Sequence, residues 1–339
     1  MERFILTSEE FAEFIIEPAF ADLTPEMPYT DTLFDWTPVD LKGKASTQLV
    51  NMRRTGNILQ RRDASCDIIY KNMMGTTLRK ITADELYAAV KHCGNSFYQG
   101  ALKDLRGKDP AFATRILPFF QQAVRQDIVS NSYFGNINRA HNPASTFSTT
   151  MYDGAFEWMK KYKASGVTPA GQTFAITNHD IRQNPATAVA VLDNLLDKQN
   201  VLMRNMPASM KRIKCSQNIV DGLVKYYRSL GQDTPTLVAQ YQNGVRVYAH
   251  NDVAIQVEPV WEPVLGEISG NANAALAVLT LAGNFHYAYD STYGEGEDMN
   301  MALMVWYEMK DLSWYYQTFM KAGVQIALPE HLFWGVTEF

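Results

Sequence analysis

The 339-residue sequence has few cysteines and no long apolar run. Cys66, Cys93 and Cys215 lie far apart and form no CxxC or Cys/His spacing, so we expect neither a disulfide framework nor a zinc site, and we infer a reducing compartment. No uninterrupted stretch of about 18 apolar residues occurs, and the N-terminus lacks the basic and apolar regions of a signal peptide. These absences predict a soluble protein that is made in the cytosol and has no contact with a membrane.

An excess of positive charge is also missing. The chain has 31 Lys and Arg against 36 Asp and Glu, for a formal net charge of -5. Tight, sequence-specific binding of nucleic acid is therefore not predicted. The sequence contains no GxxxxGK[ST] motif, no GxGxxG motif between a strand and a helix, and no GxSxG motif, so no nucleotide site and no nucleophile elbow are expected.

Residues that could carry catalysis or bind metal are scattered. The six histidines show neither HxH nor i, i+4 spacing, so no metal site and no cofactor are predicted. His179 and Asp180 are adjacent, but no partner nucleophile is identifiable, and a soluble hydrolase that uses them is kept only as an alternative of another class. The acidic segment at residues 294–298, Gly-Glu-Gly-Glu-Asp, lacks the EF-hand pattern and is expected to form a solvated turn. We expect no catalytic residue, and the protein is predicted not to be an enzyme.

Large side chains are abundant: 17 Tyr, 17 Phe, 15 Met and 6 Trp, which is typical of proteins with extensive contact surfaces. Residues 299–308 and 312–328 form two runs rich in aromatic and β-branched residues, separated by a short loop, which predicts a β-hairpin. Both alternating registers carry apolar residues, so both faces need cover, from the rest of the chain or from a second copy. The hairpin loop at Lys310 and Asp311 is the part expected to meet another copy.

Two long helices are predicted to supply cover on one face of that hairpin. Asp109 and Pro110 begin a helix that runs to about residue 134, with its apolar residues on one side. A second helix begins at Asn184 and Pro185 and carries an apolar stripe as far as Met203. Residues 81–92 fit either a helix or a strand, and we favour a strand. A shorter aromatic helix is expected from residue 154 to residue 162.

Residues 207–290 contain a succession of short strand and helix patterns, which predicts an α+β subdomain. The sequence predicts strands at residues 212–215, 244–248, 254–257 and 275–282 and a helix at residues 216–230. Because the C-terminal hairpin must return to the two long helices, this subdomain is expected to be inserted into a discontinuous domain.

The N-terminal region is predicted to be an extended arm after a helix at residues 8–20, because its prolines oppose local folding. Leu33, Phe34 and Trp36 are expected to be exposed and to need a partner surface; the alternative is packing across their own domain. We predict that deleting residues 1–40 leaves a folded subunit but impairs assembly. A predicted hairpin follows and carries four arginines: Arg53, Arg54, Arg61 and Arg62. They would contact phosphate or pair with charges of a neighbouring chain; the alternative is a solvated hairpin in which they face water.

This order of parts, together with four local stretches, resembles one family across nearly the whole chain. The stretches are MKRIKCSQNIVD at 210–221, GVRVY at 244–248, AVLTLAGNF at 277–285 and AGVQIALPEH at 322–331. The chain is similar to the Hong Kong 97 type of major capsid protein of tailed bacteriophages, and these stretches resemble capsid proteins of phages of Bacteroides-like hosts, including the crAss-like group. The resemblance implies an α+β fold with five parts: an N-terminal arm at 1–44, an E-loop hairpin at 45–92, a peripheral domain with a spine helix at 93–206, an axial domain at 207–290, and the return of the peripheral domain at 291–339.

The resemblance also implies a function. Copies of the chain would assemble, as hexamers and pentamers, into an icosahedral shell around double-stranded DNA, which they would contact without sequence specificity. Portal, scaffolding and decoration proteins are the implied partners, and the virion, assembled in the host cytoplasm, is the implied location. Some members crosslink an E-loop lysine, but no motif singles out Lys71 or Lys80, so no crosslink is predicted. The alternatives are an encapsulin-like shell that packages protein cargo, and a tail or head-completion protein that forms small rings.

Overall fold

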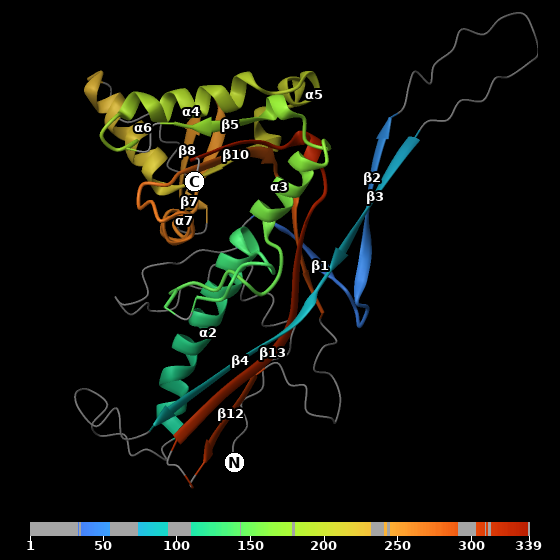
Figure 1. Cartoon of the computed structure of the whole chain (residues 1–339), viewed down its shortest axis with the longest axis vertical. Helices are drawn as coiled ribbons and strands as arrows, with labels where there is room; N and C mark the ends of the chain where they lie inside the picture. The colour runs from blue at the N-terminus through green and yellow to red at the C-terminus, as the bar shows by residue number, and fades with distance from the viewer. Residues whose placement is uncertain are drawn as a thin grey trace, which may run out of the picture.

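The computed structural model describes residues 33, 35–54, 74–93, 110–142, 144–177, 180–231, 241–242, 245–290, 303–308, 310 and 313–337. In this part of the chain, one sheet is long and narrow, a second sheet lies against helices, and a two-stranded hairpin extends from the long sheet (Figure 1). The fold is mixed α and β, as the sequence predicts.

The long sheet is built around one 14-residue strand, β13, which pairs antiparallel with three others. Its first half lies between β12 and β4, and its last residues pair with β11, which in turn pairs parallel with β1. The predicted C-terminal hairpin is therefore confirmed as β12 and β13. The strands of this sheet are β1 (Thr37–Asp40), β4 (Asp84–Cys93), β11 (Phe285–Tyr289), β12 (Leu303–Glu308) and β13 (Ser313–Ile326).

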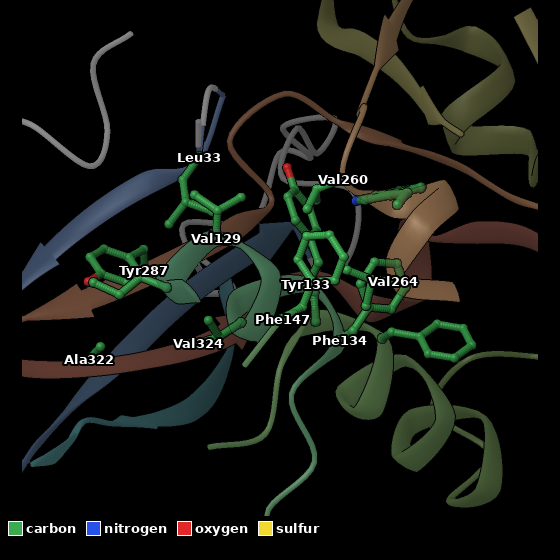
Figure 2. Packing of buried hydrophobic residues seen from close by; sticks show 14 of the residues in the cluster. Leu33, Val129, Tyr133, Phe134, Phe147, Val260, Val264, Tyr287, Ala322 and Val324 are labelled. Carbon is green, nitrogen blue, oxygen red and sulfur yellow. The ribbon is translucent and has the colours of Figure 1, made fainter. Parts of the chain in front are cut away.

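The predicted long helix is confirmed as α2 (Pro110–Phe134), and the short aromatic helix as α3 (Ala155–Ala164). The apolar side of α2 covers one face of β13, where the rings of Phe120 and Tyr316 lie 5.7 Å apart between centroids. Farther along α2, Tyr133 and Phe134 pack edge-on against Trp261 in the largest apolar cluster (Figure 2).

The second sheet has seven strands in the order β5-β14-β10-β6-β9-β8-β7. It is covered by α4 (Pro185–Asp197) and α6 (Gln217–Ser229), which approach closely because Ala188 and Gly222 are small where the helices meet. β10 is buried on both faces: Leu276 belongs to the cluster around α2, and Leu279 belongs to the cluster under α4 and α6. The strands are β5 (Thr173–Ile176), β6 (Lys211–Cys215), β7 (Tyr241–Gln242), β8 (Val245–His250), β9 (Val253–Val257), β10 (Leu276–Leu281) and β14 (Phe333–Thr337).

Several sequence-based expectations need correction. The second long helix does not cover the C-terminal hairpin, because its buried residues pack on α6 and the seven-stranded sheet. That helix also ends at Asp197, and residues beyond it form a separate short helix, α5 (Val201–Asn205). An unpredicted helix, α7 (Trp261–Ser269), follows β9. The seven-stranded sheet takes β5 and β14 from outside residues 207–290, so that range does not delimit the sheet. The helix predicted at residues 8–20 lies outside the described residues.

Residues 81–92 are extended, as predicted, but they form the end of one strand and most of the next. β2 (Ser46–Arg54) and β3 (Met74–Thr82) form an antiparallel hairpin, and after Ala83 the chain continues as β4 beside β13. Three short 3-10 helices complete the described elements: η2 (Ala170–Gln172), η3 (Ala208–Met210) and η4 (Pro329–His331).

Candidate assembly surface

The β2–β3 hairpin has two unlike faces. Residues paired across an antiparallel ladder share a face, and successive residues of a strand alternate between faces. The register pairs Val50 with Leu78 and Met52 with Thr76, and Met74 falls on the same side. Four apolar side chains of this face are largely exposed: Val50 at 51%, Met52 at 65%, Met74 at 45% and Leu78 at 57%. We call these four residues the outer face.

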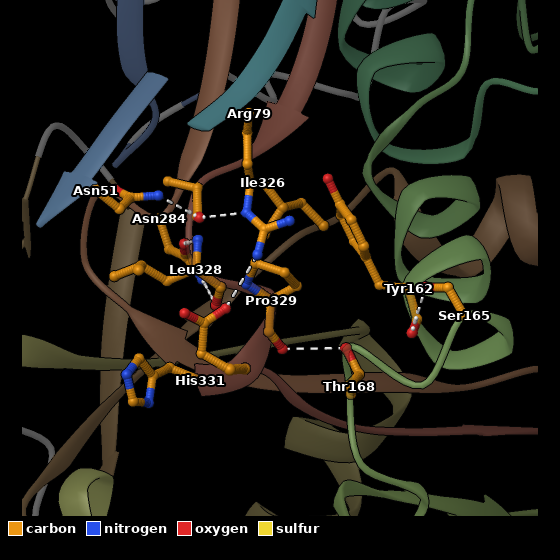
Figure 3. A network of polar contacts seen from close by, with 12 residues as sticks. Asn51, Arg79, Tyr162, Ser165, Thr168, Asn284, Ile326, Leu328, Pro329 and His331 are labelled. Carbon is orange, nitrogen blue, oxygen red and sulfur yellow. Dashed lines mark hydrogen bonds and ion pairs between the residues drawn. The ribbon is translucent and has the colours of Figure 1, made fainter. Parts of the chain in front are cut away.

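The opposite face of the hairpin is bound to its own chain. Asn51 Nδ2 and Arg79 Nε both donate to the carbonyl oxygen of Ala327, at 2.6 and 2.9 Å (Figure 3). Ile81 is fully buried in a small cluster with Leu41. One face of the hairpin is therefore hydrogen-bonded to and packed against its own chain, and the other face is apolar and exposed. Because exposed apolar patches mark sites of contact between proteins, the outer face is the strongest candidate for assembly in the described chain.

The arm residues are placed differently from the expectation. Leu33 is fully buried and Trp36 is 5% exposed, both in the large cluster of Figure 2. The Trp36 ring stacks on Phe285 at 5.2 Å, and its Nε1 donates to Tyr133 Oη at 3.1 Å. The expectation that Leu33 and Trp36 are exposed is therefore wrong, because the pairing of β1 with β11 brings this segment onto the core. Phe34 lies outside the described residues.

The same burial argues against the prediction that deleting residues 1–40 leaves a folded subunit. Such a deletion removes Trp36 and all of β1, whose four residues pair with residues 286–289. It also removes Thr37, whose Oγ1 donates to the Gly283 carbonyl oxygen at 3.0 Å.

The predicted charged contacts are only partly described. Arg53 and Arg54 lie at the end of β2, but their side chains are outside the described part, as are Arg61, Arg62 and Asp311. Lys310 is exposed in the turn between β12 and β13, and its backbone N–H donates to Glu308 Oε1 at 3.3 Å. The structure thus places Lys310 at the tip of the C-terminal hairpin, and its contact with another copy stays a prediction.

The residues considered for catalysis have a different setting. His179 lies outside the described residues, while Asp180 Oδ1 accepts from the Gln183 N–H at 3.2 Å in the turn before α4. Among the described residues, no group of three or more His, Cys, Asp or Glu is placed to hold a metal ion. In the same part of the chain, no helix is both long and apolar enough to cross a membrane.

A buried polar cluster was missed at the sequence level. Lys214 Nζ donates to Glu258 Oε1 at 2.8 Å and to Gln256 Oε1 at 2.9 Å, and Tyr133 Oη donates to the same Glu258 oxygen at 2.9 Å. Both charged side chains are only 1% exposed. Burial raises the pKa of Glu258, and the neighbouring Lys214 opposes that rise. The cluster joins α2 to β6 and to the end of β9.

The comparisons with known proteins agree with this architecture. The chain is similar to a chain of the satellite phage P4 procapsid that includes the size determination (Sid) protein, with a TM-score of 0.55, 11% identity, and coverage of 89% of this chain and 85% of that one. It is also similar to the capsid of Myoviridae phage XM1, with a TM-score of 0.51, 11% identity and 90% coverage of both chains. The chain has the fold of phage capsid proteins.

A structure of Mycobacterium phage Ogopogo gives a similar match, with a TM-score of 0.50, 9% identity and 89% coverage of both chains. No family model and no curated protein matches the sequence. The likeness is therefore one of architecture, carried by the order and packing of the elements over most of the chain, at sequence identities near one residue in ten.

Proposed function

We propose that the chain is the major capsid protein of a tailed bacteriophage, and that its copies assemble into the icosahedral head shell around double-stranded DNA. The observation that carries the proposal is the match to capsid structures over about nine tenths of both chains. The separate hairpin with its apolar outer face supports it, because a subunit that functions alone has no use for four exposed apolar side chains on one projecting ladder.

The physical basis of assembly would be a modest contact repeated many times. Full burial of a large apolar side chain is worth about 1.5–3 kcal/mol, so covering the half-exposed side chains of the outer face contributes about 1 kcal/mol each. A contact free energy of a few kcal/mol per hairpin is too small to hold one pair of subunits together. In a closed shell every copy both gives and receives such a contact, and the total becomes large.

Further parts of the proposal follow from the resemblance. The β2–β3 hairpin is the E-loop, α2 is the spine helix, and the body around the seven-stranded sheet is the axial domain. Subunits form hexamers and pentamers and work with portal, scaffolding and decoration proteins in a virion assembled in the host cytoplasm. Contact with DNA is nonspecific and uses Lys and Arg against phosphate. The protein acts structurally, not as an enzyme, and Lys310 and the hairpin arginines meet neighbouring copies.

Negative-stain microscopy of the purified chain tests the proposal. Closed shells are the expected result; small rings, or a chain that stays monomeric under assembly conditions, would contradict it. Leu78→Asp tests the outer face: the subunit should keep its thermal midpoint, because Leu78 is already 57% exposed, yet lose closed shells. Leu78→Met is the matched control and should assemble. Normal shells from Leu78→Asp would show that the outer face makes no essential contact.

A further inference from the structure

Arg79 connects the hairpin to three residues of the body. Its side chain is 13% exposed and lies on β3, three residues before that strand ends. Besides the bond from Nε to the Ala327 carbonyl oxygen, Nη2 donates to Glu330 Oε2 at 3.3 Å. The guanidinium carbon also lies 5.0 Å from the centroid of the Tyr162 ring on α3 (Figure 3). A planar fork with a face for stacking is a capability of arginine that lysine lacks.

The surface that receives Arg79 is itself held firmly. The backbone of Leu328 exchanges two hydrogen bonds with the side chain of Asn284: Leu328 N–H to Oδ1 at 2.7 Å, and Nδ2 to the Leu328 carbonyl at 3.1 Å. Thr168 Oγ1 donates to the Pro329 carbonyl oxygen at 3.0 Å. Arg79 is thus hydrogen-bonded to a segment that is held by Asn284, directly before β11, and by the loop after α3, so it anchors the hairpin to a fixed point of the body.

In the described part of the chain, a cavity of about 660 Å³ lies between the hairpin and α5. Met52 and Thr77 line the cavity from the hairpin, and Leu202 and Met206 line it from the other side. The contacts that the described chain makes with the base of the hairpin therefore decide how far the hairpin tilts over this space.

The geometry turns a small tilt into a large displacement. A strand rises about 3.4 Å per residue, so Met74 lies about 17 Å along β3 from Arg79. A rotation of about 10° at Arg79 would move Met74 by about 3 Å. Apolar contact is lost when heavy atoms separate beyond about 4–4.5 Å, so such a shift is enough to take the outer face out of register with a partner.

We propose that Arg79 is a positioning residue: by bonding to Ala327 and Glu330 and stacking on Tyr162, it fixes the tilt of the β2–β3 hairpin and so the place where the outer face meets a second copy of this chain. The proposal rests on the function proposed above. Arg79 makes no contact with the partner; it acts through the hairpin. Its loss should therefore change the geometry of the assembly more than the fold of the subunit.

The experiment compares the full-length chain with Arg79→Met, Arg79→Lys and the control Arg228→Met, under assembly conditions. Arg228 is an exposed residue of α6, outside the β2–β3 hairpin, so the control makes the same chemical change without altering the outer face. Thermal midpoints check folding, and electron microscopy measures the fraction of closed shells and their diameters. Arg79→Met should lower the closed fraction at least fivefold, while Arg228→Met should match the unaltered chain.

Arg79→Lys keeps the charge and much of the stem but loses the fork, and it should fold and give a broadened range of diameters. If Arg79→Met does not fold, Arg79→Lys decides the question, since a merely structural role leaves its diameters unchanged. Shells of ordinary diameter and yield from the folded Arg79 variants would overturn the inference while leaving the proposed function intact. Failure of the unaltered chain to form shells would instead overturn the proposed function and this inference together.

Discussion

Replacing Lys214 by methionine should strongly destabilise the subunit. Lys214 and Glu258 are each 1% exposed and are joined at 2.8 Å, so the substitution leaves a carboxylate without a counter-ion in the interior. Removing one partner of a buried ion pair costs about 3–5 kcal/mol, because the remaining charge has been taken out of water. Only the hydrogen bond from Tyr133, at 2.9 Å, would remain of the bonds described to Glu258 Oε1.

A second substitution separates the cost of the buried charge from the cost of lost packing. In Lys214→Met with Glu258→Gln, the amide oxygen still accepts from Tyr133, but no charge is buried. We expect the double variant to recover about 2 kcal/mol of the loss, and to remain less stable than the unaltered chain because Gln256 loses its hydrogen bond to Lys214, a loss of about 1 kcal/mol.

The pH dependence gives an independent check. Burial raises the pKa of Glu258, and the opposing effect of Lys214 disappears in Lys214→Met. A carboxyl whose pKa is raised on folding stabilises the folded state below its unfolded pKa, and that contribution is lost as pH rises through the folded pKa. The deficit of Lys214→Met should therefore shrink as pH falls. Urea unfolding of the unassembled subunit, followed by circular dichroism, measures it. A cost below about 1 kcal/mol at neutral pH, or a deficit that is equal at every pH, would refute this account.

Two further predictions concern the subunit alone. Burial raises the pKa of Asp127 to about 6, against the opposing hydrogen bond from the backbone of Ser148, so stability should fall by about 2 kcal/mol as pH rises from 4 to 6. Asp127→Asn should flatten this dependence in urea unfolding, and an unchanged slope would contradict the prediction. Gly323→Ala should cost more than about 3 kcal/mol or prevent folding, because the added Cβ would overlap the Thr82 carbonyl oxygen. In a thermal scan of both variants, the control Gly171→Ala should be nearly neutral, because its Cβ would meet nothing within 4 Å. A small effect at Gly323 would show that β13 and the end of β3 can move apart there.

The elements that could be predicted from the sequence are those with strong local patterns. The 25-residue helix α2 begins at Pro110 and carries an uninterrupted apolar side, and the β12–β13 hairpin is bounded by a short loop. Both patterns can be recognised within a short window of the sequence, without knowledge of distant contacts. The strands β9 and β10 could also be predicted, because each is a short and mostly apolar run, whereas three of the five residues of β6 are basic.

The sequence-based account failed where distant segments meet. The apolar stripe on α4 predicts that one side of the helix is buried, but it does not indicate which element covers that side. The close approach of α4 and α6 depends on the small residues Ala188 and Gly222, which leave no periodic pattern in the sequence. Trp36 was expected to be exposed because prolines mark its segment as extended. Extended chain is also what a parallel strand requires, and only the pairing of β1 with β11 distinguishes the two cases.

The outer face, the candidate assembly surface, was not predicted for a related reason. The four arginines drew attention to charge in this hairpin, whereas Val50 and Met52, two residues apart in β2, already predict an apolar face on that strand. What the sequence alone does not settle is which face of the hairpin its own chain would cover. That is decided by Arg79 and Asn51, which share the Ala327 carbonyl oxygen and hold the opposite face of the hairpin against the body.

The burial of Leu33 and Trp36 changes how the role of the arm in assembly has to be examined. Trp36 is bonded to Tyr133, and Tyr133 is bonded to the Glu258 oxygen that also accepts from Lys214, so the start of the described chain belongs to the joint between α2 and the seven-stranded sheet. A deletion that extends through this segment disturbs the fold and the assembly at once, and its outcome says nothing about contacts with a neighbour. A truncation that isolates those contacts has to end before Leu33, because Leu33 is already part of the subunit's own core.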